Sequence, residues 1–224
     1  MSTLLQNYAG LLNTIPAHVH LIAVSKTQPT SAIQQLYDAG QRVFGENKVQ
    51  EMNTKYQELP KDIEWHLIGH LQSNKVKYIA PYVALIHSVD SLSLLQTINK
   101  EGQKNKRIIP CLLQFHIATE ETKFGLNLEE ANALLSSTEY AGMQWVKISG
   151  VMGMATFTED EAQVRQEFAL LKNIYEMLKA RYFATDDGFT FISMGMSDDY
   201  LWAISEGSNM VRIGTSIFGE RQYV

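Results

Sequence analysis

Eight short runs rich in β-branched and aromatic residues alternate with amphipathic helical stretches, and this alternation restricts the possible folds more than any other feature. Such a pattern builds a parallel sheet, because each helix returns the chain to the same edge. Eight strands are the number that closes a (β/α)8 TIM barrel, so we predict this α/β fold. The strand candidates are HLIAVSK (20–26), RVFGE (42–46), IEWHLIG (63–69), LIHSVD (85–90), RIIPCLLQF (107–115), WVKISGVM (145–152), FTFISMG (189–195) and MVRIG (210–214).

Two observations favour the barrel over an open doubly wound sheet, the main alternative. The turn after the first strand lacks the Gly-x-Gly-x-x-Gly pattern of dinucleotide-binding sheets. The number of strand candidates is also about that which a closed ring needs. Separately, no Pro-, Gly- or Ser-rich linker divides the sequence, so residues 1–224 are expected to form a single domain. Four apolar residues recur at helical spacing before Pro16 and predict an extra N-terminal helix: Leu4, Tyr8, Leu11 and Ile15.

Several helix starts can be placed from side-chain chemistry. Ser31 with Gln34, and Thr158 with Glu161, have the spacing of a capping box. Three residues closely follow predicted strands and are N-cap candidates: Asn47, Ser91 and Ser197. Five apolar residues form a core-facing stripe after residue 161: Val164, Phe168, Leu171, Tyr175 and Leu178.

Composition and charge exclude several classes of protein. A formal net charge of -5 and a pI near 5.7 argue against nucleic acid or anionic membranes as main partners. No apolar stretch reaches the roughly 20 residues that span a bilayer, and the N-terminus lacks a basic signal-peptide start, so a cytoplasmic location is expected.

The single cysteine, Cys111, rules out an internal disulfide and is predicted to be buried. The basic stretch around Lys75 and Lys77 is interpreted as a solvated helix face.

In a barrel of this kind, function lies at the carboxyl ends of the strands. Lys26 ends the first strand there, and an ammonium group is costly to bury. It is open to three interpretations: a phosphate contact, a buried structural ion pair, or an amine that forms an imine. An imine requires the neutral amine, so the pocket would have to lower a lysine pKa of about 10.4 by desolvation or by a nearby cation such as Arg212.

The turns after the seventh and eighth strands, SMGMSDD and NMVRIGTSIFG, indicate a phosphate site. Ser197 is interpreted either as an anion ligand or as a helix cap only. Gly214 is either part of the phosphate site or a turn residue only. Arg212 either contacts the ligand or forms a structural ion pair. All strand-end candidates are Lys26, 45–47, 66–69, Ser88, 114–116, Met152, 193–197 and 212–215.

Ordered motifs along nearly the whole chain resemble the YggS/PROSC family of pyridoxal phosphate homeostasis proteins: AVSKTQP, VFGENKVQE, WHLIGHLQSNK, KFG, GVMGMATF, SMGMSDDYLWAI and NMVRIGTSIFGER. The resemblance implies the N-terminal barrel of alanine racemase, with pyridoxal 5'-phosphate (PLP) held as an aldimine. It places the aldimine on Lys26, Arg212 at the pyridine nitrogen, the phosphate on Ser197, Gly214 and Thr215, and Asn47 near the cofactor.

The chain departs from the family pattern at the end of the fifth strand. Gln114-Phe115-His116 stands where the family often has Gln-Val-Asn, so no role is assigned to His116. Lys123, in EETKFG, is carried over as a second lysine near the site, with a solvated loop lysine as the alternative.

The resemblance implies PLP homeostasis without robust catalysis. PLP enzymes usually keep the ring nitrogen protonated with a carboxylate, whereas an arginine stays charged and cannot accept that proton. In alanine racemase a second base comes from another domain of the partner subunit, which we do not expect here. The protein is therefore expected to be a non-enzymatic monomer that sequesters PLP and releases it to apo PLP-dependent enzymes.

Other functions remain as alternatives. A PLP-dependent amino-acid racemase is one. A class I aldolase would also use a barrel lysine and a phosphate site, but it needs an acid/base pair near the imine. His66 and His70 have the spacing of helical zinc ligands, but the usual glutamate beside the first histidine is absent, so no metal is expected.

Overall fold

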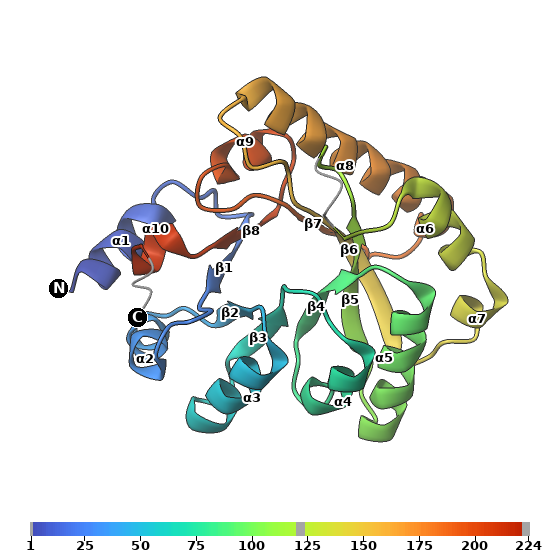
Figure 1. The fold of residues 1–224 in the computed structure, drawn as a ribbon, viewed down its shortest axis with the longest axis horizontal. Coiled ribbons are helices and arrows are strands. Elements are labelled where there is room, and N and C mark those ends of the chain that lie inside the picture. The colour runs from blue at the N-terminus through green and yellow to red at the C-terminus, as the bar shows by residue number, and fades with distance from the viewer. Residues whose placement is uncertain (1, 120–123, 221–224) are drawn as a thin grey trace.

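The computed structural model describes residues 2–119 and 124–220. Eight parallel strands pair in sequence order, and β8 closes on β1 to complete the barrel (Figure 1). The predicted TIM-barrel class is confirmed. The strands are β1 (His20–Val24), β2 (Val43–Glu46), β3 (Glu64–Leu67), β4 (Leu85–Val89), β5 (Ile109–Phe115), β6 (Val146–Gly153), β7 (Phe191–Ser193) and β8 (Met210–Ile213).

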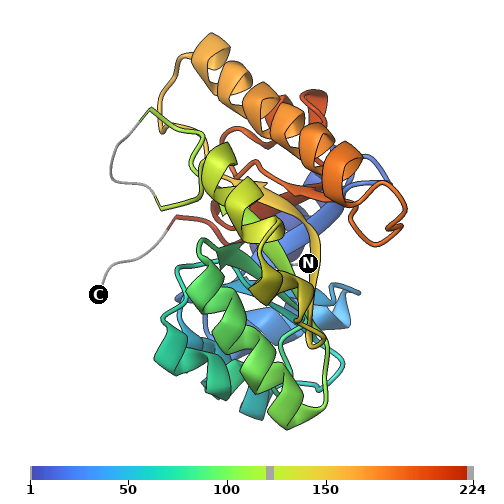
Figure 2. The same ribbon diagram turned by 90° about the vertical axis from the view of Figure 1, so that its right-hand side faces the viewer.

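Helices surround the barrel, and Figure 2 shows the long α8 lying along one side of it. No helix in the described ranges is long and apolar enough to cross a membrane. The helices are α1 (Thr3–Leu12), α2 (Thr30–Asp38), α3 (Val49–Glu58), the 3-10 turn η1 (Ser73–Lys75), α4 (Val76–Ile79), α5 (Leu92–Asn105), α6 (Leu128–Leu135), α7 (Thr138–Ala141), α8 (Glu161–Tyr182), α9 (Tyr200–Ser205) and α10 (Thr215–Phe218).

The predicted N-terminal helix is α1, and it packs beside α10 (Figure 1). Tyr8 and Leu11 are its buried residues, and the Tyr8 hydroxyl donates to Gln41 Oε1 over 3.0 Å. The helix therefore covers the barrel next to the β1–β8 seam, where the chain closes on itself.

Strand alternation gives the barrel two different faces. Outward-facing side chains join the helices in the main core, which includes buried Cys111 as predicted. The interior contains an apolar cluster of Ile22, Leu85, Leu112, Met152 and Met210. It also contains buried polar side chains: His66, His87, Ser193 and Arg212. The polar interior residues contact one another, and the site described below depends on them.

Several predicted helix caps are wrong. Ser91 does cap α5, since its hydroxyl accepts from Leu94 N–H. Asp160 rather than Thr158 caps α8, because its carboxylate accepts from Gln163 N–H. Three predictions placed the cap at the wrong residue: α2 follows Pro29 rather than Ser31, α3 follows Lys48 rather than Asn47, and α9 follows Asp199 rather than Ser197.

The stripe on α8 provides a matched test of core packing. Leu171 is fully buried against the barrel, whereas the neighbouring Leu170 is 45% exposed. Leu171→Ala should lower the free energy of unfolding by about 2–5 kcal/mol, because it leaves a cavity in the core. Leu170→Ala should change it by about 0.5 kcal/mol or less. Urea denaturation of both variants checks this expectation, and equal losses would contradict the packing described here.

Candidate functional site

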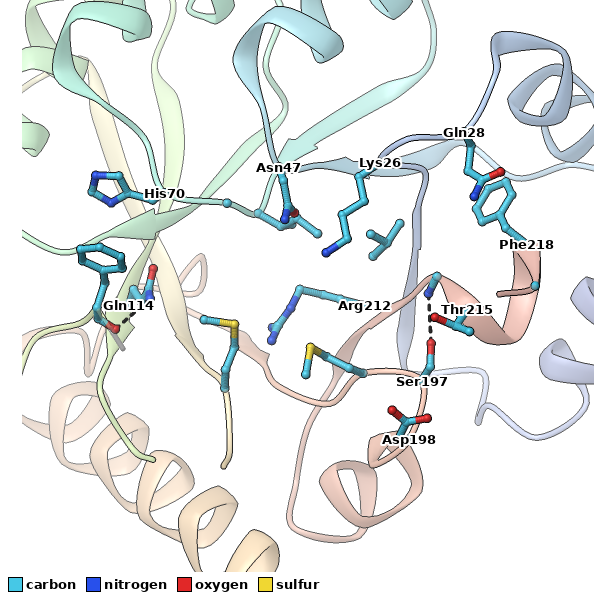
Figure 3. Close-up of a pocket in the computed structure, with 18 residues that line it drawn as sticks. Lys26, Gln28, Asn47, His70, Gln114, Ser197, Asp198, Arg212, Thr215 and Phe218 are labelled. Carbon is cyan, nitrogen blue, oxygen red and sulfur yellow. Dashed lines mark hydrogen bonds between the residues drawn. The ribbon is translucent and has the colours of Figure 1, made fainter. Parts of the chain in front are cut away.

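A cavity of about 420 Å³ opens at the carboxyl ends of the strands (Figure 3). The structure brings all of the predicted site residues to its lining: Lys26, Asn47, Ser197, Arg212, Gly214 and Thr215. Arg212 lies within β8 and the others follow β1, β2, β7 or β8, so they converge only because the barrel closes. The cavity therefore lies where the sequence predicted a binding site, at the carboxyl ends of the strands.

Lys26 lies two residues beyond β1 and extends into the cavity toward Arg212 (Figure 3). The next residue, Thr27, has a φ of 66°, a left-handed conformation that is unusual for a β-branched residue. Its backbone N–H donates to Glu51 Oε1 over 2.6 Å, which fixes this turn against α3. The lysine therefore stands on a strained turn that a neighbouring helix stabilises.

A buried ion-pair network stabilises the same turn from outside the barrel. Lys55 Nζ donates to Glu46 Oε1 over 2.8 Å, to Glu51 Oε1 over 2.6 Å and to the Ser25 carbonyl oxygen over 2.7 Å. The Ser25 hydroxyl also donates to Glu46 Oε1 over 2.6 Å. Burial raises the pKa of Glu46, while the Lys55 charge opposes that rise. Lys55 thus joins β2, α3 and the residue directly before Lys26.

Arg212 is a buried cation at the base of the cavity and is only 4% exposed. Its Nη1 donates to the Ser193 carbonyl oxygen over 2.8 Å and to Ser193 Oγ over 2.7 Å, and its Nη2 donates to the Gly153 carbonyl oxygen over 3.0 Å. No carboxylate within the described ranges forms an ion pair with it. Burial lowers the pKa of Arg212 to about 10 against the opposing effect of the Asp199 carboxylate, which leaves the guanidinium protonated at neutral pH. Such a charge favours an anionic or electron-rich ligand.

Ser197 lies between two backbone donors. Its hydroxyl oxygen is 3.3 Å from Gly214 N and 3.4 Å from Ser216 N, and both N–H groups donate to it. These distances are long for N–H···O bonds, so both donors are weakly satisfied. The interpretation of Ser197 as a cap of the following helix is wrong, because Asp199 stands before α9 and accepts from Met196 N–H. The cluster offers a hydroxyl and backbone N–H groups of the kind that bind a phosphate.

Asn47 reaches the cavity because the ends of β2 and β3 approach closely. A Cβ atom at Gly69 would lie 2.5 Å from the Asn47 carbonyl oxygen, so the approach requires glycine there. Met196, within the predicted range 193–197, also lines the cavity. Sequence reasoning missed other lining residues, which lie beyond the strand ends: Gln28, His70, Phe124, Met154, Asp198 and, in α10, Phe218. Among these, His70 stacks on Phe124 with ring centroids 4.6 Å apart, and the Gln114 amide donates to the Phe124 carbonyl oxygen.

The remaining candidates fall into different places. His66 and His70 have separate partners, since His66 contacts His87 inside the barrel and His70 lies 3.6 Å from Asp90. His116 follows β5 but does not line the cavity. Lys123 lies outside the described residues. Lys75 and Lys77 lie over the Tyr78 ring.

Fold and site together define a class: a TIM-barrel protein whose lysine amine and buried arginine face one ligand cavity. The family model described as alanine racemase, N-terminal domain, matches residues 1–222. A pyridoxal phosphate homeostasis protein of Aquifex aeolicus is 40% identical over 91% of this chain and 87% of its own length. A pyridoxal phosphate homeostasis protein of Escherichia coli K12 is 38% identical over 93% of this chain and 88% of its own length. The chain therefore belongs to the pyridoxal phosphate homeostasis family, as its motifs predicted.

Solved structures agree with this assignment. PipY of Synechococcus elongatus, solved with PLP bound, is 35% identical with a TM-score of 0.87 over 97% of this chain and all of that one. An alanine racemase of Clostridium difficile is 11% identical with a TM-score of 0.76 over 98% of this chain and 57% of its own. At that identity the likeness concerns the fold alone.

The ion-pair network near Lys26 leads to a stability prediction. Lys55→Met should lower the free energy of unfolding by about 3–5 kcal/mol, because it leaves the buried Glu46 carboxylate without its cation. The pKa of Glu46 should then rise further, so the loss should be larger near about pH 8 than near about pH 5, where the carboxyl can take up a proton. Urea denaturation at both pH values measures the loss.

A matched control is Lys100→Met, which replaces an exposed lysine on α5. That variant should change the free energy of unfolding by about 0.5 kcal/mol or less at either pH. If Lys55→Met were equally mild, the ion pair would not stabilise the turn that carries Lys26.

Proposed function

We propose that this protein binds PLP through Lys26 and serves PLP homeostasis by holding the cofactor and releasing it, without robust catalysis of its own. The observation that carries the proposal is that Lys26 and Arg212 face the same cavity beside the Ser197–Gly214 turn (Figure 3). Membership of the pyridoxal phosphate homeostasis family supports it, as does the PLP-bound structure of PipY.

The cavity residues fit the chemical groups of PLP one by one. The Lys26 amine suits the aldehyde, with which it would form a C=N bond as one water leaves. Ser197 and the backbone at Gly214 and Thr215 suit the phosphate dianion. Arg212 suits the pyridine nitrogen, and Asn47 lies beside Lys26 at the cavity wall (Figure 3).

The same residues favour storage over turnover. PLP supplies an electron sink most effectively when its ring nitrogen is protonated. Arg212 remains protonated itself and donates hydrogen bonds, so it favours the unprotonated nitrogen. The part of the cavity lining that the structure describes contains no tyrosine that could act as a second racemase base. These features support a binding protein over a racemase.

The proposal extends to partners and assembly. We infer that the protein releases PLP to apo PLP-dependent enzymes, since an imine to a lysine reverses when another amine attacks it. We infer also that residues 1–224 act as one domain and as a monomer, because the barrel closes with strands of its own chain.

Covalent trapping tests the central proposal. Addition of PLP should produce a new absorption band, and borohydride reduction should add one PLP to the peptide containing Lys26. Lys26→Ala should lose both the band and the adduct, whereas Lys100→Ala should keep them. A trapped sugar phosphate would support the aldolase instead, and absence of any adduct at Lys26 would refute covalent PLP binding at this site.

The phosphate assignment leads to a separate prediction. Ser197→Ala should weaken binding of PLP by about 10- to 100-fold, because it removes a hydrogen bond to a charged group. Binding of pyridoxal, which lacks the phosphate, should change little. Absorbance titrations with both ligands measure the two affinities, with Ser93→Ala, a change at an exposed residue of α5, as the control. Equal losses for PLP and pyridoxal would show that Ser197 does not bind the phosphate.

A further inference from the structure

A row of neutral side chains runs through the barrel interior away from Arg212. The guanidinium Nη1 lies 2.7 Å from Ser193 Oγ, which lies 3.1 Å from His87 Nδ1. His87 Nε2 then lies 3.0 Å from His66 Nδ1. The row connects β8, β7, β4 and β3, and its members are all buried. Binding of PLP by the cavity residues does not by itself require polar side chains at Ser193, His87 and His66 in the barrel interior.

The chemistry of Arg212 fixes the direction of these hydrogen bonds. A guanidinium only donates, so Ser193 Oγ accepts from Arg212. The hydroxyl proton of Ser193 then has His87 Nδ1 as its acceptor, since Ser193 Oγ has no other partner in the described ranges. His87 therefore carries its proton on Nε2 and donates it to His66 Nδ1. The reverse direction would leave a buried hydroxyl proton unsatisfied, which is unfavourable.

This arrangement requires both histidines to be neutral. Burial, together with a smaller effect of the nearby His20, lowers the pKa of His66 to about 3. Burial also lowers the pKa of His87 well below its usual value, and His66 and Arg212 act in the same direction. At neutral pH each imidazole thus has one acceptor nitrogen and one donor nitrogen, as the row needs.

Neutral acceptors leave the charge of Arg212 available to a ligand. A carboxylate partner would hold the guanidinium too, but it would cancel much of its charge. Three of the five N–H donors of a guanidinium bond to Ser193 and Gly153, which leaves two. The guanidinium is therefore held on one side by neutral groups and keeps two donors, and the nearby Asp199 carboxylate acts on its charge without a direct ion pair in the described ranges.

We propose that Ser193, His87 and His66 are positioning residues that hold Arg212 against the ring nitrogen of bound PLP and so keep that nitrogen unprotonated. This inference rests on the proposed function. It gives a role to side chains that do not line the cavity. It also predicts that a substitution of His87, which reaches the ligand only through Ser193 and Arg212, changes the hydrogen bonding of the ring nitrogen of PLP.

The direction of the row can be tested without cofactor. Nitrogen-15 NMR of the histidines in the apo-protein should show His87 and His66 both as neutral tautomers with the proton on Nε2. A proton on Nδ1 of His87, or a doubly protonated ring at neutral pH, would overturn the proposed direction.

The effect on the ligand is tested with PLP labelled with nitrogen-15 in its ring. His87→Asn keeps an oxygen that can accept from the Ser193 hydroxyl. His87→Leu introduces a side chain of nearly the same shape as asparagine that has no hydrogen-bond acceptor. The ring-nitrogen signal should shift in His87→Leu toward that of a nitrogen without a hydrogen bond, and it should stay near the wild-type value in His87→Asn. Ser193→Ala, which removes the hydroxyl, should shift the signal as His87→Leu does and replaces that variant if it fails to fold.

The outcomes separate the two proposals. Failure of the wild-type protein to take up PLP would overturn the proposed function. Uptake of PLP with the same ring-nitrogen signal in the wild type, His87→Leu and Ser193→Ala would overturn the inference alone, and so would equal shifts in His87→Asn and His87→Leu.

Discussion

A protonated guanidinium buried inside a β-barrel is the constraint on which the rest of this site depends. Taking Arg212 out of water is unfavourable, and within the described ranges no carboxylate pairs with it. Carbonyl oxygens and a hydroxyl hold it instead. The remaining charge faces a cavity that also receives Lys26 and the Ser197 turn. A ligand with an aldehyde, an electron-rich ring nitrogen and a phosphate suits all three, which is why PLP explains the arrangement better than a simple anion does.

The two cationic residues are supported from opposite sides of the barrel wall. Arg212 depends on inward-facing groups of neighbouring strands, while the turn at Lys26 depends on the Lys55 ion pairs between β2 and α3. The strained Thr27 backbone lies between Lys26 and its support on Glu51. The turn that carries Lys26 and the guanidinium of Arg212 are both held by neighbouring groups, which suits the proposed role of holding a cofactor.

Local patterns predicted the strands and most of the site. Each predicted strand is a short run rich in β-branched, aromatic or other apolar residues, and barrel closure brings Arg212 of β8 together with residues that follow β1, β2, β7 and β8. Helix caps were harder, because neighbouring polar residues can each accept from a different backbone N–H: Thr158 accepts from Asp160, and Asp160 accepts from Gln163 and caps α8. The His66–His87 contact could not be foreseen, since it depends on which face of β3 and β4 turns inward. The Glu46–Lys55 pair likewise depends on how α3 packs.

The most direct test of the account is a crystal structure of the protein grown with PLP. The account predicts continuous electron density from Lys26 Nζ to the cofactor, with the phosphate at Ser197 and Gly214 and the ring nitrogen within hydrogen-bond distance of Arg212. Density for PLP at another lysine, or a cofactor in this cavity with its ring nitrogen turned away from Arg212, would contradict it.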